Sequence, residues 1–129
     1  MKILETCLYA EDLEECRQFY EELLGIPQIS YDESRHLFLR LDHSVLIVFK
    51  ASKTRLPDAG VPPHGTEGAG HAAFAASLEE IVSWRRRLAD AGVPIIQEVE
   101  WGPGVRSIYF QDPAGNVLEF AVPKLWFRE

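Results

Sequence analysis

The chain has 129 residues, 47% of them hydrophobic and 26% charged, which fits one globular domain. Its formal net charge of −7 argues against non-specific binding to nucleic acid or to an anionic membrane. The apolar run at residues 45–49 is far too short to span a bilayer, and the early carboxylate of Glu5 is unlike a secretion signal. Cys7 and Cys16 stand in no zinc-binding spacing and fit a reducing compartment. We therefore expect a cytoplasmic protein.

The first half of the sequence predicts one strand, one helix and three further strands. Alternation over residues 3–10 is typical of a strand with Glu5 and Cys7 on one face. Asp12 suits a helix N-cap, and apolar residues recur behind it at helical spacing up to Leu24. The three further strands are expected at about 28–32, 36–41 and 44–50.

The second half repeats this order after a connector rich in proline and glycine, residues 51–70. A strand is expected from His71 and a helix from Leu78 to Ala91. The last three strands are expected at about 95–101, 105–111 and 117–122.

Matching stretches support an internal repeat. Leu78-Glu79-Glu80 corresponds to Leu13-Glu14-Glu15, and Ala91-Gly92-Val93-Pro94 corresponds to Leu24-Gly25-Ile26-Pro27. Such a repeat sets the architecture of a chain. We predict one α+β domain, residues 1–129, made of two tandem βαβββ modules. Its parts are a first module at 1–50, the connector at 51–70, a second module at 71–122 and a C-terminal tail at 123–129.

Superposing the two halves brings candidate functional residues into register. Glu5 and His71 fall at equivalent positions on the first strand of each half, allowing one residue of slack. Ile47 and Glu119 fall at equivalent positions on the last strand. Three of these four positions therefore hold residues that are able to bind a metal ion.

Burial gives a physical reason for a shared ion. An ionised carboxylate in apolar surroundings is costly unless it is paired, and Glu119 lies between Leu118 and Phe120. One divalent ion would satisfy Glu5, His71 and Glu119 together, and this ligand set suits Mn, Fe, Co, Ni or Zn. The alternatives are a solvated carboxylate at Glu5 and a histidine bonded to the backbone at His71.

Three stretches carry a resemblance to a known family: Gly70 to Phe74, Trp84 to Pro94 and Arg106 to Glu119. In this order and spacing, the chain resembles the vicinal oxygen chelate superfamily of glyoxalases, bleomycin-resistance proteins and dioxygenases. The resemblance implies that the two modules form a cupped mixed sheet around a divalent metal ion, often in a homodimer. By position, it implies that His71 and Glu119 bind the metal and that Glu5 replaces the usual first histidine.

Within that superfamily, the stretch from Arg106 to Phe110 is closest in motif to the fosfomycin-resistance branch. The resemblance implies that Tyr109 contacts the substrate and that Arg128 binds a substrate anion. Arg106, at the mouth of the same strand, is a further candidate for holding that anion. Cys7 stands where that branch has a threonine, and it is a candidate for lining the substrate pocket.

We therefore expect a metal-dependent enzyme that acts on a small oxygen-rich or anionic substrate as a lyase, isomerase or thiol transferase. Glu5 or Glu119 would also be able to act as a base. The alternative is a metal-free protein that sequesters a small molecule, as bleomycin-resistance proteins do. A third interpretation is a structural homologue without either property.

Overall fold

The computed structural model describes residues 1–57 and 60–128. Residues 58 and 59 of the predicted connector, and residue 129 of the predicted tail, lie outside the described residues. The chain divides into two compact units. Unit 1 comprises Met1–Gly70 with Pro113–Asn116, and unit 2 comprises His71–Asp112 with Val117–Glu129.

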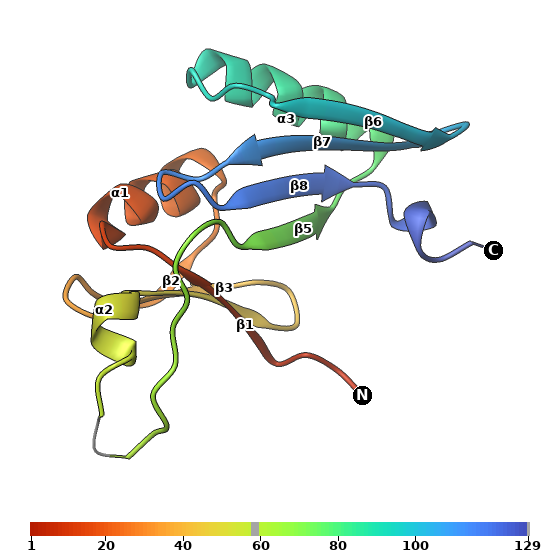
Figure 1. Ribbon diagram of the computed structural model, residues 1–129. Helices are drawn as coiled ribbons and strands as arrows, with labels where there is room; N and C mark the ends of the chain where they lie inside the picture. The colour runs from red at the N-terminus through yellow and green to blue at the C-terminus, as the bar shows by residue number, and fades with distance from the viewer. Residues whose placement is uncertain (58–59, 129) are drawn as a thin grey trace. The chain divides into compact units, whose positions relative to one another are not determined.

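Unit 1 contains a four-stranded mixed sheet in the order β1-β4-β3-β2 (Figure 1). β1 and β4 are parallel, and β2, β3 and β4 are antiparallel neighbours. Its strands are β1 (Glu5–Tyr9), β2 (Gln28–Asp32), β3 (His36–Arg40) and β4 (Val45–Phe49). Its helical segments are α1 (Leu13–Arg17), η1 (Gln18–Leu23) and α2 (Ala51–Thr54).

The helix of unit 1 begins as predicted, because the Asp12 side chain accepts a hydrogen bond from the Glu15 backbone N–H at 3.0 Å. Its second part, η1, is wound as a π-helix, which the sequence pattern did not predict. Apolar side chains of α1 and η1 pack against one face of the sheet. The buried residues of this core include Leu13, Cys16, Tyr20, Leu37, Leu39, Leu46 and Val48.

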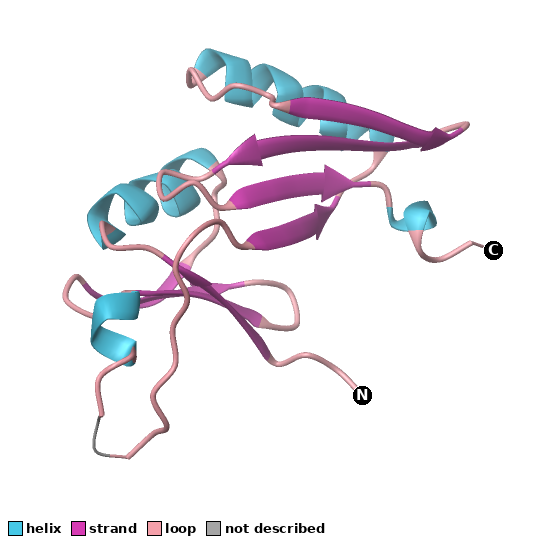
Figure 2. Cartoon of the chain, in the orientation of Figure 1, coloured by secondary structure: helices cyan, strands magenta, loops and turns pink. Residues whose placement is uncertain are grey.

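Unit 2 contains a second four-stranded mixed sheet in the corresponding order β5-β8-β7-β6. Its strands are β5 (His71–Ala75), β6 (Gln97–Gly102), β7 (Val105–Gln111) and β8 (Val117–Ala121). Its helical segments are α3 (Leu78–Asp90) and the 3₁₀ turn η2 (Pro123–Leu125), shown with the strands in Figure 2.

One face of the second sheet packs against α3. Ile81 and Leu88 of the helix are at most 1% exposed, and Trp84 stacks on Phe120 with ring centroids 4.6 Å apart. Phe110 stacks on the other side of the cluster, 5.2 Å from Phe120. Because side chains alternate along a strand, this arrangement leaves Tyr109 and Glu119 to the opposite face.

The two four-stranded mixed sheets confirm the α+β class and the repeated strand–helix–three-strand order. Within the predicted connector, residues 51–54 form the short helix α2 directly after β4. In the described part of the chain, no helix is both long and apolar enough to cross a membrane.

Candidate functional site in unit 2

A polar cluster lies on the face of the second sheet that α3 does not cover. The strand register pairs Glu119 with Ala73 on one side and with Tyr109 on the other. His71 lies two residues before Ala73, and Ser107 lies two residues before Tyr109, so both share the face of Glu119. We call His71, Ser107, Tyr109 and Glu119 the polar cluster.

His71 and Glu119 form the centre of the polar cluster. His71 Nε2 lies 3.3 Å from Glu119 Oε1, while His71 Nδ1 lies 2.8 Å from the backbone oxygen of Val117. A carbonyl only accepts, so Nδ1 carries the proton that it donates. The side chain of Glu119 is 6% exposed and that of His71 is 52% exposed. The imidazole is therefore open to solvent above a buried carboxylate.

This pair favours a cation between its two atoms. A neutral imidazole that donates through Nδ1 presents the lone pair of Nε2 toward an oxygen that is also electron-rich. A proton on Nε2 or a divalent ion removes that repulsion. Two ligand atoms about 2.0–2.2 Å from one ion stand about 2.8–3.6 Å apart at octahedral or tetrahedral angles. The observed separation of 3.3 Å lies in this range.

Ser107 bonds to the second carboxylate oxygen of Glu119, and Trp101 bonds to Ser107. Ser107 is 0% exposed, and its hydroxyl donates to Glu119 Oε2 at 2.5 Å. Trp101 Nε1 donates to Ser107 Oγ at 3.0 Å. The sequence analysis did not single out these two residues. The sequence did hold one indication for Ser107, which lies two residues before Tyr109 on the same predicted strand and so shares its face.

Tyr109 is the member of the polar cluster that lies on β7 beside Glu119. Its ring stacks on His71 with centroids 6.2 Å apart and an interplanar angle of 25°. Burial is the largest cause that raises the pKa of the Tyr109 hydroxyl, followed by the charge of Glu119 and a hydrogen bond to that carboxylate. The phenol therefore stays protonated near neutral pH and is able to donate.

The corresponding face of the first sheet has an apolar residue, Ile47, at the position of Glu119. The register pairs Cys7 with Ile47 in the first sheet and Ala73 with Glu119 in the second. Glu5 and His71 each lie two residues before these partners, so they occupy equivalent positions. The register also matches Phe38 to Tyr109. The repeat thus confirms the predicted equivalence of positions, while the two modules differ in the chemistry of these faces.

The other predicted residues of unit 1 lie on this face. Glu5 is exposed, and Cys7 is a half-buried free thiol whose pKa is raised, first by burial and then by the charge of Glu5. Among the described residues, no three His, Cys, Asp or Glu side chains gather as a ready-made metal centre. The role of Glu5 as a third ligand therefore stays a prediction.

The structure places Arg106 apart from the polar cluster, and its contact with a substrate anion stays a prediction. Along β7, Arg106 alternates with Ser107 and so points to the face opposite the polar cluster. Its Nη2 lies 3.7 Å from Glu100 Oε2 on the neighbouring strand. Arg128 lies exposed in the tail beyond η2, and its contact with a substrate stays a prediction.

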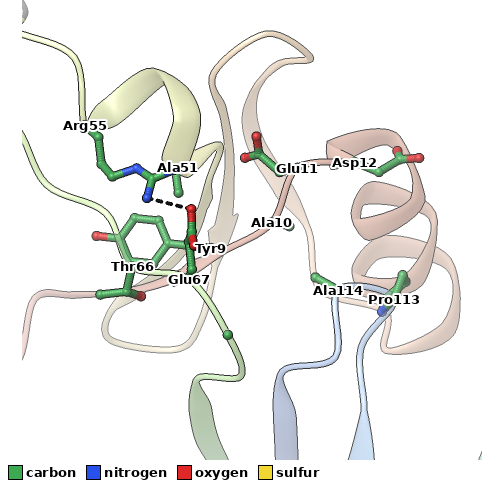
Figure 3. Close-up of a pocket in the computed structure, with 11 residues that line it drawn as sticks. Tyr9, Ala10, Glu11, Asp12, Ala51, Arg55, Thr66, Glu67, Pro113 and Ala114 are labelled. Atoms are coloured by element: carbon green, nitrogen blue, oxygen red, sulfur yellow. Dashed lines mark hydrogen bonds and ion pairs between the residues drawn. The ribbon is translucent and has the colours of Figure 1, made fainter.

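A separate hollow of about 400 Å³ lies in unit 1 and contains none of the predicted site residues. Figure 3 shows Arg55 and Glu67 at its rim, joined by an ion pair of 2.9 Å. The side chains of this pair are 43% and 77% exposed, so the interaction is worth little. The polar cluster of unit 2 remains the better candidate for chemistry.

Comparisons with known proteins agree with this fold. The family described as Glyoxalase/Bleomycin resistance protein/Dioxygenase superfamily matches residues 2–120. The chain is 32% identical to a lactoylglutathione lyase from Agrobacterium tumefaciens, with a TM-score of 0.94 over 99% of this chain and 98% of that chain. No curated protein is a significant match to the sequence.

Two further structures are more distant. A glyoxalase/bleomycin resistance protein/dioxygenase from Nocardioides is 26% identical, with a TM-score of 0.74 over 95% of this chain and 83% of that chain. A virulence protein from Salmonella typhimurium is 25% identical, with a TM-score of 0.72 over 95% of this chain and 96% of that chain. None of these three carries a fosfomycin-resistance description, so that finer expectation stays unconfirmed. The chain belongs to the Glyoxalase/Bleomycin resistance protein/Dioxygenase superfamily.

Proposed function

We propose that the protein is a metal-dependent lyase or isomerase that acts on a small oxygen-rich substrate at the polar cluster. The observation that carries the proposal is the separation of 3.3 Å between His71 Nε2 and Glu119 Oε1, with Nδ1 engaged by the Val117 carbonyl. Histidine ligands of metals usually donate their second ring N–H in this way, which fixes the tautomer and the ring orientation.

Each residue of the polar cluster has a distinct task. His71 Nε2 and Glu119 Oε1 hold a divalent ion such as Mn, Fe, Co, Ni or Zn, with Glu5 as the proposed third ligand. The bound ion supplies a Lewis acid that stabilises negative charge on substrate oxygens. Tyr109, whose ring stacks on His71, lies beside this pair and orients the substrate.

The choice of a lyase over a thiol transferase rests on a comparison. The relative from Agrobacterium tumefaciens is a lactoylglutathione lyase that matches nearly the full length of this chain at 32% identity. We therefore place lactoylglutathione first among substrates to test. The fosfomycin-type reaction, which the stretch around Tyr109 suggests by resemblance, comes second.

The proposal is tested by metal content and activity together. Protein purified without chelator is loaded in turn with Mn²⁺, Ni²⁺, Co²⁺, Fe²⁺ and Zn²⁺, and the bound metal is measured by elemental analysis. We expect about one ion per chain, loss of that ion in Glu119→Gln and His71→Ala, and metal-dependent lactoylglutathione lyase activity. Glu100→Gln, an exposed carboxylate on the neighbouring strand, serves as the matched control and should keep the ion.

A negative result also has a clear meaning. If no ion binds at any loading, the enzyme proposal is wrong, and the metal-free sequestering protein becomes the better description. Retention of the ion in Glu119→Gln would equally contradict the proposed site.

A further inference from the structure

A directed hydrogen-bond chain runs from Trp101 through Ser107 to Glu119. An indole N–H only donates and an ionised carboxylate only accepts, so the ends of the chain set the direction of both bonds. Ser107 Oγ accepts from Trp101 Nε1 at 3.0 Å and donates its single proton to Glu119 Oε2 at 2.5 Å. The hydroxyl therefore has one orientation that satisfies both partners.

This chain makes the two oxygens of Glu119 unequal. Oε2 is occupied by the Ser107 hydroxyl, whereas Oε1 faces His71 Nε2 at 3.3 Å. Ser107 is 0% exposed, so water cannot take its place without a rearrangement of the sheet. The carboxylate is thus held with one chosen oxygen toward the imidazole.

The first module has no such arrangement at the matching positions. The register matches Ser107 to His36 and Glu119 to Ile47. His36 Nε2 bonds instead to Ser30 Oγ at 3.0 Å, and Ile47 is 4% exposed with no polar atom on its side chain. The hydrogen bonds from Trp101 through Ser107 therefore occur only in the module that has the carboxylate, and they are not a general feature of the repeat.

We propose that Ser107 and Trp101 are positioning residues, which hold the Glu119 carboxylate so that Oε1 meets the metal ion beside His71. This inference rests on the proposed function, because it assumes that Glu119 is a metal ligand. Trp101 acts through Ser107 and needs no contact with the ion. Nothing in the metal-ligand motif of the chain assigns a role to either residue.

The first measurement is the affinity for Zn²⁺, by competition with a chromophoric chelator. Removing a hydrogen-bond partner of a metal ligand typically weakens binding by about 10–100-fold, and we expect this range for Ser107→Ala. Ser107→Thr keeps the hydroxyl and should restore most of the affinity. Trp101→Phe leaves the Ser107–Glu119 bond in place, so it should weaken binding less than Ser107→Ala. Ser30→Ala removes the hydroxyl from a serine of unit 1 that is bonded to His36 and should leave the affinity unchanged.

The second measurement reports on the hydrogen-bond chain itself. In a ¹⁵N–¹H spectrum, the indole N–H signal of Trp101 should shift when Zn²⁺ is added, because the ion draws charge from the carboxylate at the end of the chain. The indole signal of Trp84, which packs against Phe120 on the other face of the sheet, should stay in place and confirms that each variant is folded. The Zn²⁺-dependent shift of Trp101 should disappear in Ser107→Ala and return in Ser107→Thr.

The outcomes separate this inference from the proposed function. If wild-type protein binds Zn²⁺ and Glu119→Gln does not, while Ser107→Ala binds as tightly as wild type, the proposed function stands and the positioning role is wrong. If wild-type protein binds no ion, both are wrong. Weakened binding in Ser107→Ala that Ser107→Thr does not restore, with the Trp101 signal insensitive to Zn²⁺, would mean that Ser107 only fills space.

Discussion

At the scale of single residues, the matched positions Ile47 and Glu119 show how burial decides chemistry. Both residues are at most 5% exposed on the last strand of their modules. Ser107 donates to one oxygen of Glu119, and the other oxygen faces His71, where a proton or a divalent ion would compensate the charge. The strand register pairs Ile47 with Cys7 and Phe38, and the position of the Ser107 hydroxyl is taken by the His36 ring, whose Nε2 is bonded to Ser30. A carboxylate at Ile47 would therefore lack the hydroxyl donor that Glu119 has.

A carboxylate placed at Ile47 should therefore destabilise the fold. We expect Ile47→Glu to lower the free energy of unfolding by on the order of 3–5 kcal/mol at neutral pH, because it buries an uncompensated charge. Burial raises the pKa of the new carboxyl in the folded state, so the loss should shrink as the pH falls toward about 4. Urea denaturation at several pH values measures this. Ile47→Gln is the uncharged control, and a penalty as pH-dependent as that of Ile47→Glu would contradict the argument.

A second residue-scale feature is the network around Glu14. Its carboxylate accepts from Arg17 Nε at 2.9 Å and from the Tyr31 hydroxyl at 2.8 Å. Hydrogen bonds from Arg17 and then Tyr31 lower the pKa of Glu14 from 4.5 to about 2. Burial and then the bond to Glu14 raise the pKa of Tyr31 from 10.0 to about 12.

These opposite shifts predict a pH window for the contribution of Tyr31. A lowered carboxyl pKa gives stability that is present above pH 4.5 and lost as the pH falls through about 2. A raised tyrosine pKa gives stability that is present below pH 10.0 and lost as the pH rises through about 12. Tyr31→Phe should thus be most destabilising between these limits, as measured by urea denaturation. The same substitution in a Glu14→Gln background should have a smaller effect; an equal effect would show that the two groups are not coupled.

At the scale of elements, α3 is the helix that supports the sheet of the polar cluster. Ser77 precedes it and accepts a hydrogen bond from the Glu80 backbone N–H at 3.1 Å. Its apolar side carries Ile81 and Leu88, both buried against β7 and its neighbours. Loss of either the cap or this packing should destabilise the sheet that carries the polar cluster.

The cap of α3 gives a direct test. Ser77→Ala should lower the free energy of unfolding by about 1 kcal/mol, because the backbone N–H of Glu80 loses its acceptor. Thermal denaturation followed by circular dichroism checks this. Ser83→Ala, at an exposed position inside the same helix, should be neutral or slightly stabilising, since alanine is the better helix former. Equal losses in the two variants would argue against the capping role.

At the scale of the whole molecule, the repeat is what made the fold predictable. Hydrophobic periodicity located the strands and helices, and the matched stretches after each helix placed them in the same order twice. The strand register then confirmed that Glu5 matches His71 and that Ile47 matches Glu119. His71, Tyr109 and Glu119 could be predicted to share a face, because side chains alternate along each strand.

What escaped prediction depends on geometry that a sequence pattern does not carry. The register of β6 and β7 shifts between Glu100 and Gly102, so Trp101 is an extra residue without a partner on β7. This register shift is a β-bulge, and the hydrogen bond from the Trp101 indole to Ser107 is seen only once the strands are paired. Nearness in sequence singled out Arg106, whereas the alternation of side chains along β7 places it on the face opposite Ser107 and Tyr109.

The most direct test of the account is the position of a metal ion in crystals grown with Zn²⁺, located by its anomalous scattering. We expect a peak about 2.0–2.2 Å from both His71 Nε2 and Glu119 Oε1, with Glu119 Oε2 still bonded to Ser107. A third protein ligand in the same map would test the proposed role of Glu5. Full-occupancy zinc bound elsewhere, or none at the polar cluster at saturating Zn²⁺, would contradict the central claim that this pair holds the metal.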